Sequence, residues 1–214
     1  MQRVLIIGAT GGIGSELFRQ MADSKDYEVV GWSSLDLDLD YPERIFDCDF
    51  SDIDILINCA GHNQGNYQGF MKNSWQNQYS QIKVNYISNL FLLKHYAHQR
   101  SQGKYVWLSS ASMDNPRIFH NTYIASKVAS KFTIDLITKE ITHVNVLEAR
   151  VGLVKSKVRY RNFEGTKTMQ EVQDSYANES WAMDCDHVAK HLLLAIEQNL
   201  TYTEIISSLF KTTP

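Results

Sequence analysis

Short apolar runs alternate along this chain with longer segments of helical period, and this alternation restricts the possible folds more than any single motif. The apolar runs predict buried strands at residues 4–7, 29–32, 53–57, 105–108 and 144–147, with a short last strand at 204–207. The longer segments predict helices at residues 15–23, 75–99, 123–141 and 184–198. Repeated strand-helix units are typical of a mostly parallel sheet with helices on both faces. We therefore expect a doubly wound, three-layer α/β protein.

Composition limits the size and the partners of this protein. With 214 residues, 43% of them hydrophobic, the chain can bury the core of one domain spanning residues 1–214. The net charge is −3 and the basic residues form no dense run, so nucleic acid and a membrane surface are not implied. A small-molecule ligand fits better. Three cysteines without a Cys-x-x-Cys pair suit a reducing compartment, and no apolar run resembles a signal peptide. We expect a cytoplasmic location.

A glycine-rich turn follows the first predicted strand. Residues 8–14 read Gly-Ala-Thr-Gly-Gly-Ile-Gly and lead directly into a predicted helix. Glycines let the backbone approach a pyrophosphate closely, while N–H groups at the helix start donate hydrogen bonds to its oxygens. A turn that merely joins strand to helix is the alternative. The strand before and the helix after favour a dinucleotide site at Gly8, Thr10, Gly11, Gly12, Ile13 and Gly14.

The end of the second predicted strand bears on the choice between NAD and NADP. A carboxylate there hydrogen-bonds the ribose hydroxyls of NAD, whereas a basic or small hydroxyl residue accommodates the 2'-phosphate of NADP. The chain has Ser33 and Ser34 at this place, and its nearest carboxylate is Asp36. We therefore favour NADP and keep NAD as the alternative.

Metal sites are not expected in this sequence. The alternating carboxylates of residues 35–40 lack the glycine that a calcium loop needs, because Tyr41 occupies that position. The acidic residues at 47–52 include no histidine and no paired spacing, which favours a solvated loop. His187 and His191 are four residues apart on the last predicted helix, but no third ligand is suggested.

Two tyrosine–lysine pairs have the spacing of about one helical turn. They are Tyr123 with Lys127, and Tyr79 with Lys83. On a helix such a pair shares one face, and a cation beside a phenol lowers its pKa from about 10 by roughly 1 to 3 units. Such a phenol is a usable general acid or base. The spacing alone does not separate the two pairs.

A predicted strand ends in hydroxyl groups at residues 109–112. Ligands bind at the carboxyl ends of parallel strands, so Ser110 can point at a substrate. A serine nucleophile is the alternative, but the Gly-x-Ser-x-Gly turn typical of that chemistry is absent.

In their order along the chain, these motifs resemble the short-chain dehydrogenase/reductase family. Residues 8–14 have the family's Gly-xxx-Gly-x-Gly spacing, and the Asn-Cys-Ala-Gly of residues 58–61 is similar to its Asn-Asn-Ala-Gly. Ser110 lies thirteen positions before Tyr123, which matches the family's separation of catalytic serine and tyrosine. The residue thirteen positions before the other tyrosine lies in a predicted loop. The resemblance therefore selects Tyr123.

The resemblance implies a Rossmann-like fold and an oxidoreductase that interconverts a carbonyl and a secondary alcohol with NADP or NAD. Tyr123 would be the general acid and base, and Lys127 would lower its pKa and bind the nicotinamide ribose. Ser110 would hydrogen-bond the substrate oxygen, and Asn85 would hold a relay water. Asp38 would lie beside the adenine. Further implied cofactor contacts are Asn58, Cys59, Ala60, Gly61, Val151, Gly152, Val154 and Ser156.

Three expectations concern the rest of the chain. Residues 157–183 are polar, aromatic-rich and weakly periodic, and predict a mobile lid over the substrate. The resemblance implies a homodimer or homotetramer, although the tail lacks the family's Gly-Gly ending. Two other functions stay open, because a fold does not fix a function: a dinucleotide-binding regulatory protein, or an epimerase or isomerase that uses the same residues.

Overall fold

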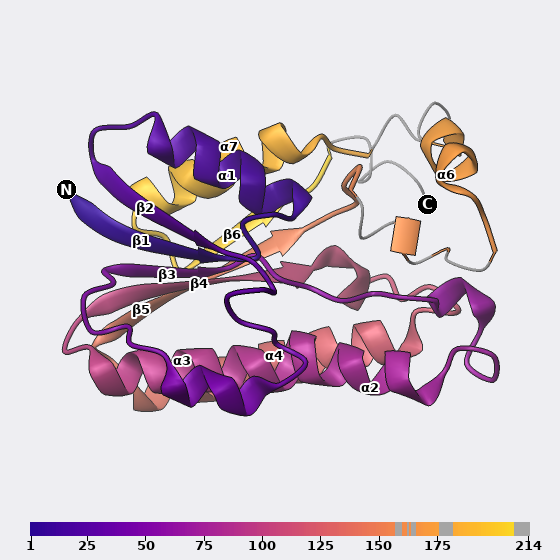
Figure 1. Ribbon diagram of the computed structural model, residues 1–214, viewed down its shortest axis with the longest axis horizontal. Helices are drawn as coiled ribbons and strands as arrows, with labels where there is room; N and C mark the ends of the chain where they lie inside the picture. Colours follow the sequence, from indigo (N-terminus) through magenta and orange to yellow (C-terminus); the bar gives the residue numbers. More distant parts are fainter. Residues whose placement is uncertain (157–159, 162, 164–165, 176–181, 208–214) are drawn as a thin grey trace.

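The protein is built on a sheet of parallel strands. The computed structural model describes residues 1–156, 160–161, 163, 166–175 and 182–207. In this part of the chain, six parallel strands lie in the spatial order β2-β1-β3-β4-β5-β6 (Figure 1). Their bounds are β1 (Gln2–Ile7), β2 (Tyr27–Trp32), β3 (Ile55–Asn58), β4 (Gly103–Ser110), β5 (Val144–Val151) and β6 (Tyr202–Ile205). Every apolar run that predicted a strand contributes to this sheet.

Helices cover both faces of the sheet. On one face lie α1 (Gly12–Ala22) and α7 (Cys185–Glu197) (Figure 1). On the other lie α2 (Trp75–Ile82), α3 (Ser88–Gln99) and α4 (Asn121–Glu140). A shorter helix, α6 (Met169–Ser175), stands apart from both layers. The expected doubly wound, three-layer arrangement is confirmed.

The first strand shows why both faces need cover. Val4 and Ile6 belong to a core cluster that contains residues of α1 and α7, whereas Leu5 and Ile7 belong to a second cluster with residues of α3. All four side chains are at most 1% exposed. Because successive side chains of a strand point to opposite faces, an unbroken apolar run is stable only when each face is packed against helices.

The order of the strands places a crevice beside β1. The chain leaves β1 for β2 on one side and returns to β3 on the other. Between β2 and β3 it forms only a short 3-10 helix, Pro42–Asp47. Crossovers that depart in opposite directions leave a crevice at the carboxyl ends of the two strands, which is where open α/β sheets bind ligands.

The described residues provide neither a membrane-spanning helix nor a group of metal ligands. No helix within the described residues is long and apolar enough to cross a membrane. In the same part of the chain, no three His, Cys, Asp or Glu side chains are grouped so that they could hold a metal ion.

Candidate active site

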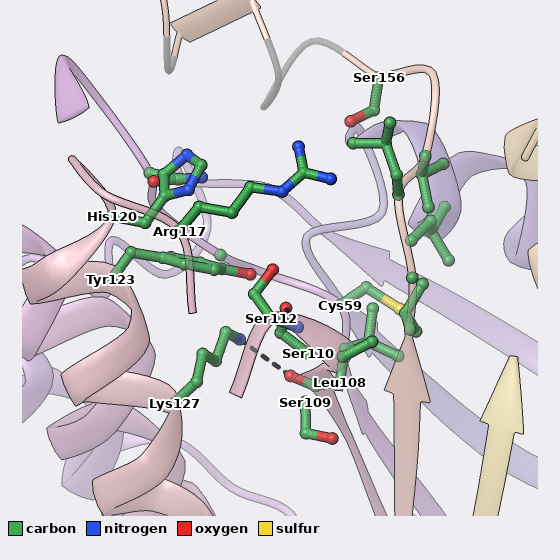
Figure 2. Close-up of a pocket in the computed structure, with 18 of the residues that line it drawn as sticks. Cys59, Leu108, Ser109, Ser110, Ser112, Arg117, His120, Tyr123, Lys127 and Ser156 are labelled. Carbon is green, nitrogen blue, oxygen red and sulfur yellow. Dashed lines mark hydrogen bonds between the residues drawn. The ribbon is translucent and has the colours of Figure 1, made fainter. Parts of the chain in front are cut away.

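A pocket lies at the carboxyl ends of the central strands. Its walls come from the segments that follow β3, β4 and β5, from the start of α1 and from α4 (Figure 2). Many of the residues predicted for the site are brought together here. They are Ile13, Cys59, Ala60, Gly61, Ser110, Tyr123, Lys127, Val151, Gly152, Val154 and Ser156.

Tyr123 and Lys127 project from the first turns of α4 into this pocket. The Lys127 ammonium lies 5.9 Å from the centre of the Tyr123 ring and donates a hydrogen bond of 2.8 Å to the backbone carbonyl of Leu108 on β4 (Figure 2). Lys127 is 4% exposed. Because burial disfavours the charged form, it lowers the pKa of Lys127 to about 8.

The pKa of Tyr123 moves in the opposite direction to the one expected. Burial raises it, and a side-chain hydrogen bond with Ser110 only partly opposes that rise. We expected Lys127 to lower this pKa, but its ammonium is directed at the carbonyl of Leu108. The phenol is therefore protonated at neutral pH in this structure.

Two adjacent serines at the end of β4 have different surroundings. The Ser109 hydroxyl donates a hydrogen bond of 2.5 Å to the buried carboxylate of Glu148, which also pairs with Lys131 at 3.0 Å. Ser110 lies on the other face of the strand, beside Tyr123 (Figure 2), and its hydroxyl accepts the N–H of Ser112 at 3.2 Å. Both serines border the pocket, but strand alternation directs only the Ser110 hydroxyl toward Tyr123, while Ser109 is bound to Glu148.

The second tyrosine–lysine pair lies elsewhere. The Lys83 ammonium is 5.1 Å from the centre of the Tyr79 ring, so the geometry within this pair is similar to that of Tyr123 and Lys127. Lys83, however, pairs with the carboxylate of Asp40 at 3.1 Å, and Tyr79 is 52% exposed. Neither residue lines the pocket.

Asn85 lies in a π-helical turn, Lys83–Ile87, between α2 and α3. It is fully buried, and its side chain accepts the His62 N–H at 2.8 Å and donates to the His62 carbonyl at 2.7 Å and to the Ser126 hydroxyl at 3.1 Å. Its backbone carbonyl accepts from Ser130 at 2.7 Å. Asn85 therefore joins the segment after β3 to α4, and its role as a water anchor stays a prediction.

Asn58, the last residue of β3, points into the core. Its side chain donates to the Asn89 side chain at 2.8 Å and accepts the N–H of Ala60 at 3.1 Å. The Tyr105 hydroxyl donates to the same Asn89 oxygen at 2.9 Å. Asn58 is 1% exposed and does not line the pocket. It fixes the turn whose following residues, 59–61, form the pocket wall.

The glycine-rich turn brings α1 close to β1. Gly8 has a φ of +80°, in the left-handed region that favours glycine. A side chain at Gly14 would collide with the Gly8 carbonyl, so the helix can pack this tightly only because Gly14 lacks one. No side chain caps the start of α1, and its first turn contains no acidic residue. The N–H groups at this helix start therefore suit a phosphate.

The segment after β2 places a carboxylate near the two predicted serines. Asp36 accepts hydrogen bonds from the Ser33 N–H at 2.8 Å and from the Ser33 hydroxyl at 2.9 Å. These bonds lower the pKa of Asp36. Ser34 is exposed beside this turn. Asp38 is half-buried and accepts the N–H of Asp40 at 3.0 Å, and its place beside the adenine stays a prediction.

The predicted lid is described only in part. Residues 157–159, 162, 164–165 and 176–181 lie outside the described residues. Within the described part, Phe163 stacks on the pocket residue Tyr67, with ring centres 4.0 Å apart and an angle of 14° between the rings. Closure over a substrate stays a prediction.

Several pocket residues were missed from the sequence. They lie in the segment between β4 and α4, or before α2, and include Tyr67, Asn115, Arg117 and His120. Irregular segments have no periodicity, and no motif marks these positions. The available signal was that the segment 111–122 directly joins Ser110 to Tyr123, both of which were predicted to lie in the site.

Comparisons with known proteins agree with the fold. A family model described as short chain dehydrogenase matches residues 45–167. No curated protein sequence matches the chain. A small-chain dehydrogenase in complex with NADPH has a TM-score of 0.79 at 19% identity, over 96% of this chain and 95% of that one. An alcohol dehydrogenase from Thermococcus sibiricus complexed with 5-hydroxy-NADP has a TM-score of 0.75 at 17% identity, over 100% and 99%.

A third structure resembles the chain equally well. The aldohexose dehydrogenase of Thermoplasma acidophilum, in ligand-free form, has a TM-score of 0.79 at 16% identity, over 100% of this chain and 95% of that one. At these identities the likeness concerns the fold.

Proposed function

The chain belongs to the short-chain dehydrogenase family, and from that premise we propose that it is an NADP-dependent oxidoreductase that interconverts a carbonyl and a secondary alcohol. The observation that carries the proposal is the placement of the Tyr123, Ser110 and Lys127 side chains together in a pocket at the carboxyl ends of the strands (Figure 2). A protein that only binds a dinucleotide does not need this arrangement.

Tyr123 is the proton donor in the proposed reduction and the proton acceptor in the reverse reaction. Its raised pKa keeps the hydroxyl protonated at neutral pH, which is the state that reduction requires. Ser110 donates a hydrogen bond to the substrate oxygen, where negative charge develops as the carbonyl is reduced. Lys127 holds α4 against β4 through Leu108 and binds the nicotinamide ribose.

The residues around the glycine-rich turn fit a dinucleotide. The uncapped start of α1 would hold the pyrophosphate, and residues 59–61 and 151–156 border the part of the pocket that faces Tyr123. When bound, NADPH supplies the hydride, and the protein positions it and holds the proton. Ser33, Ser34 and Asp38 would contact the adenosine end.

NADP is preferred over NAD for two reasons. Ser33 and Ser34 leave room for a 2'-phosphate at the end of β2, and two of the three compared structures contain NADPH or an NADP derivative. The Asp36 carboxylate, which is hydrogen-bonded to Ser33, favours NAD instead because its negative charge would repel a 2'-phosphate. Its Oδ2 already accepts both of these hydrogen bonds, which leaves that oxygen less available to a ribose.

Titration and turnover together test this proposal. Purified protein is titrated with NADPH and with NADH by fluorescence, and NADPH oxidation is then followed with a panel of ketones and aldehydes. The proposal predicts saturable NADPH binding that is tighter than NADH binding, and oxidation that depends on the carbonyl compound. Binding without turnover of any carbonyl compound would favour a regulatory protein, and absence of both would reject the proposal.

A further inference from the structure

We propose that Arg117 makes the pocket selective for carbonyl substrates that carry an anionic oxygen group, a carboxylate or a phosphate, elsewhere in the same molecule. This inference rests on the proposed function and names the substrate class of the same site. It comes from the placement of Arg117, from the charge of the pocket lining and from the contacts that hold the segment in position.

Arg117 is positioned at the reacting end of the pocket. It lies in the segment between β4 and α4, which joins Ser110 to Tyr123, and it lines the pocket. Figure 2 shows its side chain extending across the pocket, with Arg117 and Lys127 on opposite sides of Tyr123. Arg117 and Tyr123 therefore face the same pocket.

The charge of the lining has one sign. Among the described residues that line the pocket, Arg117 and Lys127 are basic and none is an aspartate or glutamate. The acid closest in sequence, Asp114, pairs with Arg150 at 2.7 Å and does not line the pocket. A substrate with an anionic group is attracted to such a site more strongly than a neutral one.

The segment that carries Arg117 is held by packing and by a turn. The His120 N–H donates to the Arg117 carbonyl at 3.3 Å, and Phe119 between them has a φ of +72°. His120 is 7% exposed, and its ring meets the Tyr67 ring edge-on, with centres 5.0 Å apart. A bulky residue in the left-handed region is strained and persists only where its surroundings fix it. Arg117 is thus presented from a defined turn.

The chemistry of the guanidinium suits an anionic oxygen group. Its five N–H donors form a planar fork that binds two oxygens of a carboxylate or phosphate at once. This number of donors also allows Arg117 to keep another contact while it binds a substrate. A lysine at this place offers a point charge without the fork, so charge alone reproduces only part of the effect.

Three matched ketones test the inference. Wild-type protein is assayed with NADPH and 4-acetylbenzoate, 4-acetylphenyl phosphate or the neutral methyl 4-acetylbenzoate, and the same assays follow for Arg117→Gln, Arg117→Lys and Lys94→Gln. Lys94 is exposed on α3 outside the pocket and provides the control for loss of one positive charge. The two anionic ketones distinguish a carboxylate from a phosphate as the preferred group.

The expected result is that Arg117→Gln loses kcat/KM selectively for the anionic ketones. Wild-type kcat/KM should be roughly 10- to 100-fold higher for at least one anionic ketone than for the ester, the range of a charged hydrogen bond. Arg117→Gln should lower kcat/KM for that anionic ketone at least tenfold more than for the ester, Arg117→Lys should keep part of the preference, and Lys94→Gln should leave it intact. Equal rates for all ketones in the wild type, or equal losses on all of them in Arg117→Gln, would overturn the inference.

Failure of the proposed function gives a different pattern. If no ketone is reduced, the anion site is tested without turnover. Protein with NADPH present is titrated calorimetrically with 4-acetylbenzoate and with 4-acetylphenyl phosphate. Binding of either compound that Arg117→Gln weakens at least tenfold supports the anion site even though the oxidoreductase proposal fails. Absence of binding, or binding that is unchanged in Arg117→Gln, overturns the anion site as well.

Discussion

Lys127 donates a hydrogen bond of 2.8 Å to the backbone carbonyl of Leu108, and this bond ties α4 to the end of β4. The same contact sets Tyr123, one turn earlier on α4, beside Ser110, two residues further along β4. The lysine thus has a structural role in this protein besides its proposed contact with the cofactor. Its burial and its depressed pKa make that role measurable.

The stability of the protein should rise with pH between about 8 and 10.5 through Lys127. Burial lowers the folded-state pKa to about 8, whereas the unfolded chain keeps the ordinary value, so the unfolded state binds more protons in this window. From pH 7.5 to 9.5 the free energy of unfolding should increase by about 2 kcal/mol more in the wild type than in Lys127→Met. Urea unfolding at both pH values measures this, and identical pH dependence in the two proteins contradicts it.

Ser110→Ala should affect catalysis and Ser109→Ala should affect stability, although the residues are adjacent. Loss of the Ser110 hydroxyl should lower kcat by roughly 100-fold, because it removes a donor to the developing negative charge. Ser109→Ala should spare kcat and lower the free energy of unfolding by about 1–3 kcal/mol, because Glu148 loses a buried donor. Steady-state kinetics and urea unfolding of both variants test this. Equal activity losses would mean that strand alternation does not select the serine.

Asn85→Ala should destabilise the protein strongly. The side chain makes hydrogen bonds with the backbone of His62 and with Ser126, and its removal leaves buried groups unpaired, at a cost of about 2–4 kcal/mol. Gln76→Ala, at an exposed position on α2, is the control and should change stability by less than about 0.5 kcal/mol. Chemical unfolding of both variants tests this; a small effect at Asn85 together with lost activity would favour the water-anchor role.

Charge changes after β2 should shift the cofactor preference. Ser34→Asp adds a carboxylate that would repel a 2'-phosphate, so the ratio of NADPH to NADH affinity should fall about tenfold or more. Asp36→Asn removes the charge held on Ser33 and should raise the same ratio. Fluorescence titration with both cofactors measures it. An unchanged ratio in both variants would place the 2'-hydroxyl site away from this turn.

Much of the fold follows from the sequence because its signals are local. The apolar run 4–7 predicts β1 through the need to cover both faces, and the glycine spacing predicts the tight contact between Gly8 and Gly14. Within the site, the spacing of Tyr123 and Lys127 places both on one side of α4. In each case, backbone geometry over a few residues determines the outcome.

Other features depend on contacts between distant residues and could not be predicted. The pKa of Tyr123 is set by burial among segments that meet only in the folded protein, and Lys127 turns to a strand carbonyl nineteen positions earlier. The π-helical turn around Asn85 has no motif that marks it. Arg117 lies in an irregular segment, where only the folded chain shows that it lines the pocket.

The most direct measurement compares Tyr123→Phe with Tyr79→Phe in NADPH-dependent reduction of a carbonyl substrate. Both changes remove one phenol hydroxyl beside a lysine on a helix, but only Tyr123 lines the pocket. Loss of the general acid should lower kcat by roughly 100-fold or more in Tyr123→Phe while NADPH affinity is retained, and Tyr79→Phe should keep wild-type kcat. Reductase activity that survives unchanged in Tyr123→Phe would contradict the proposed mechanism.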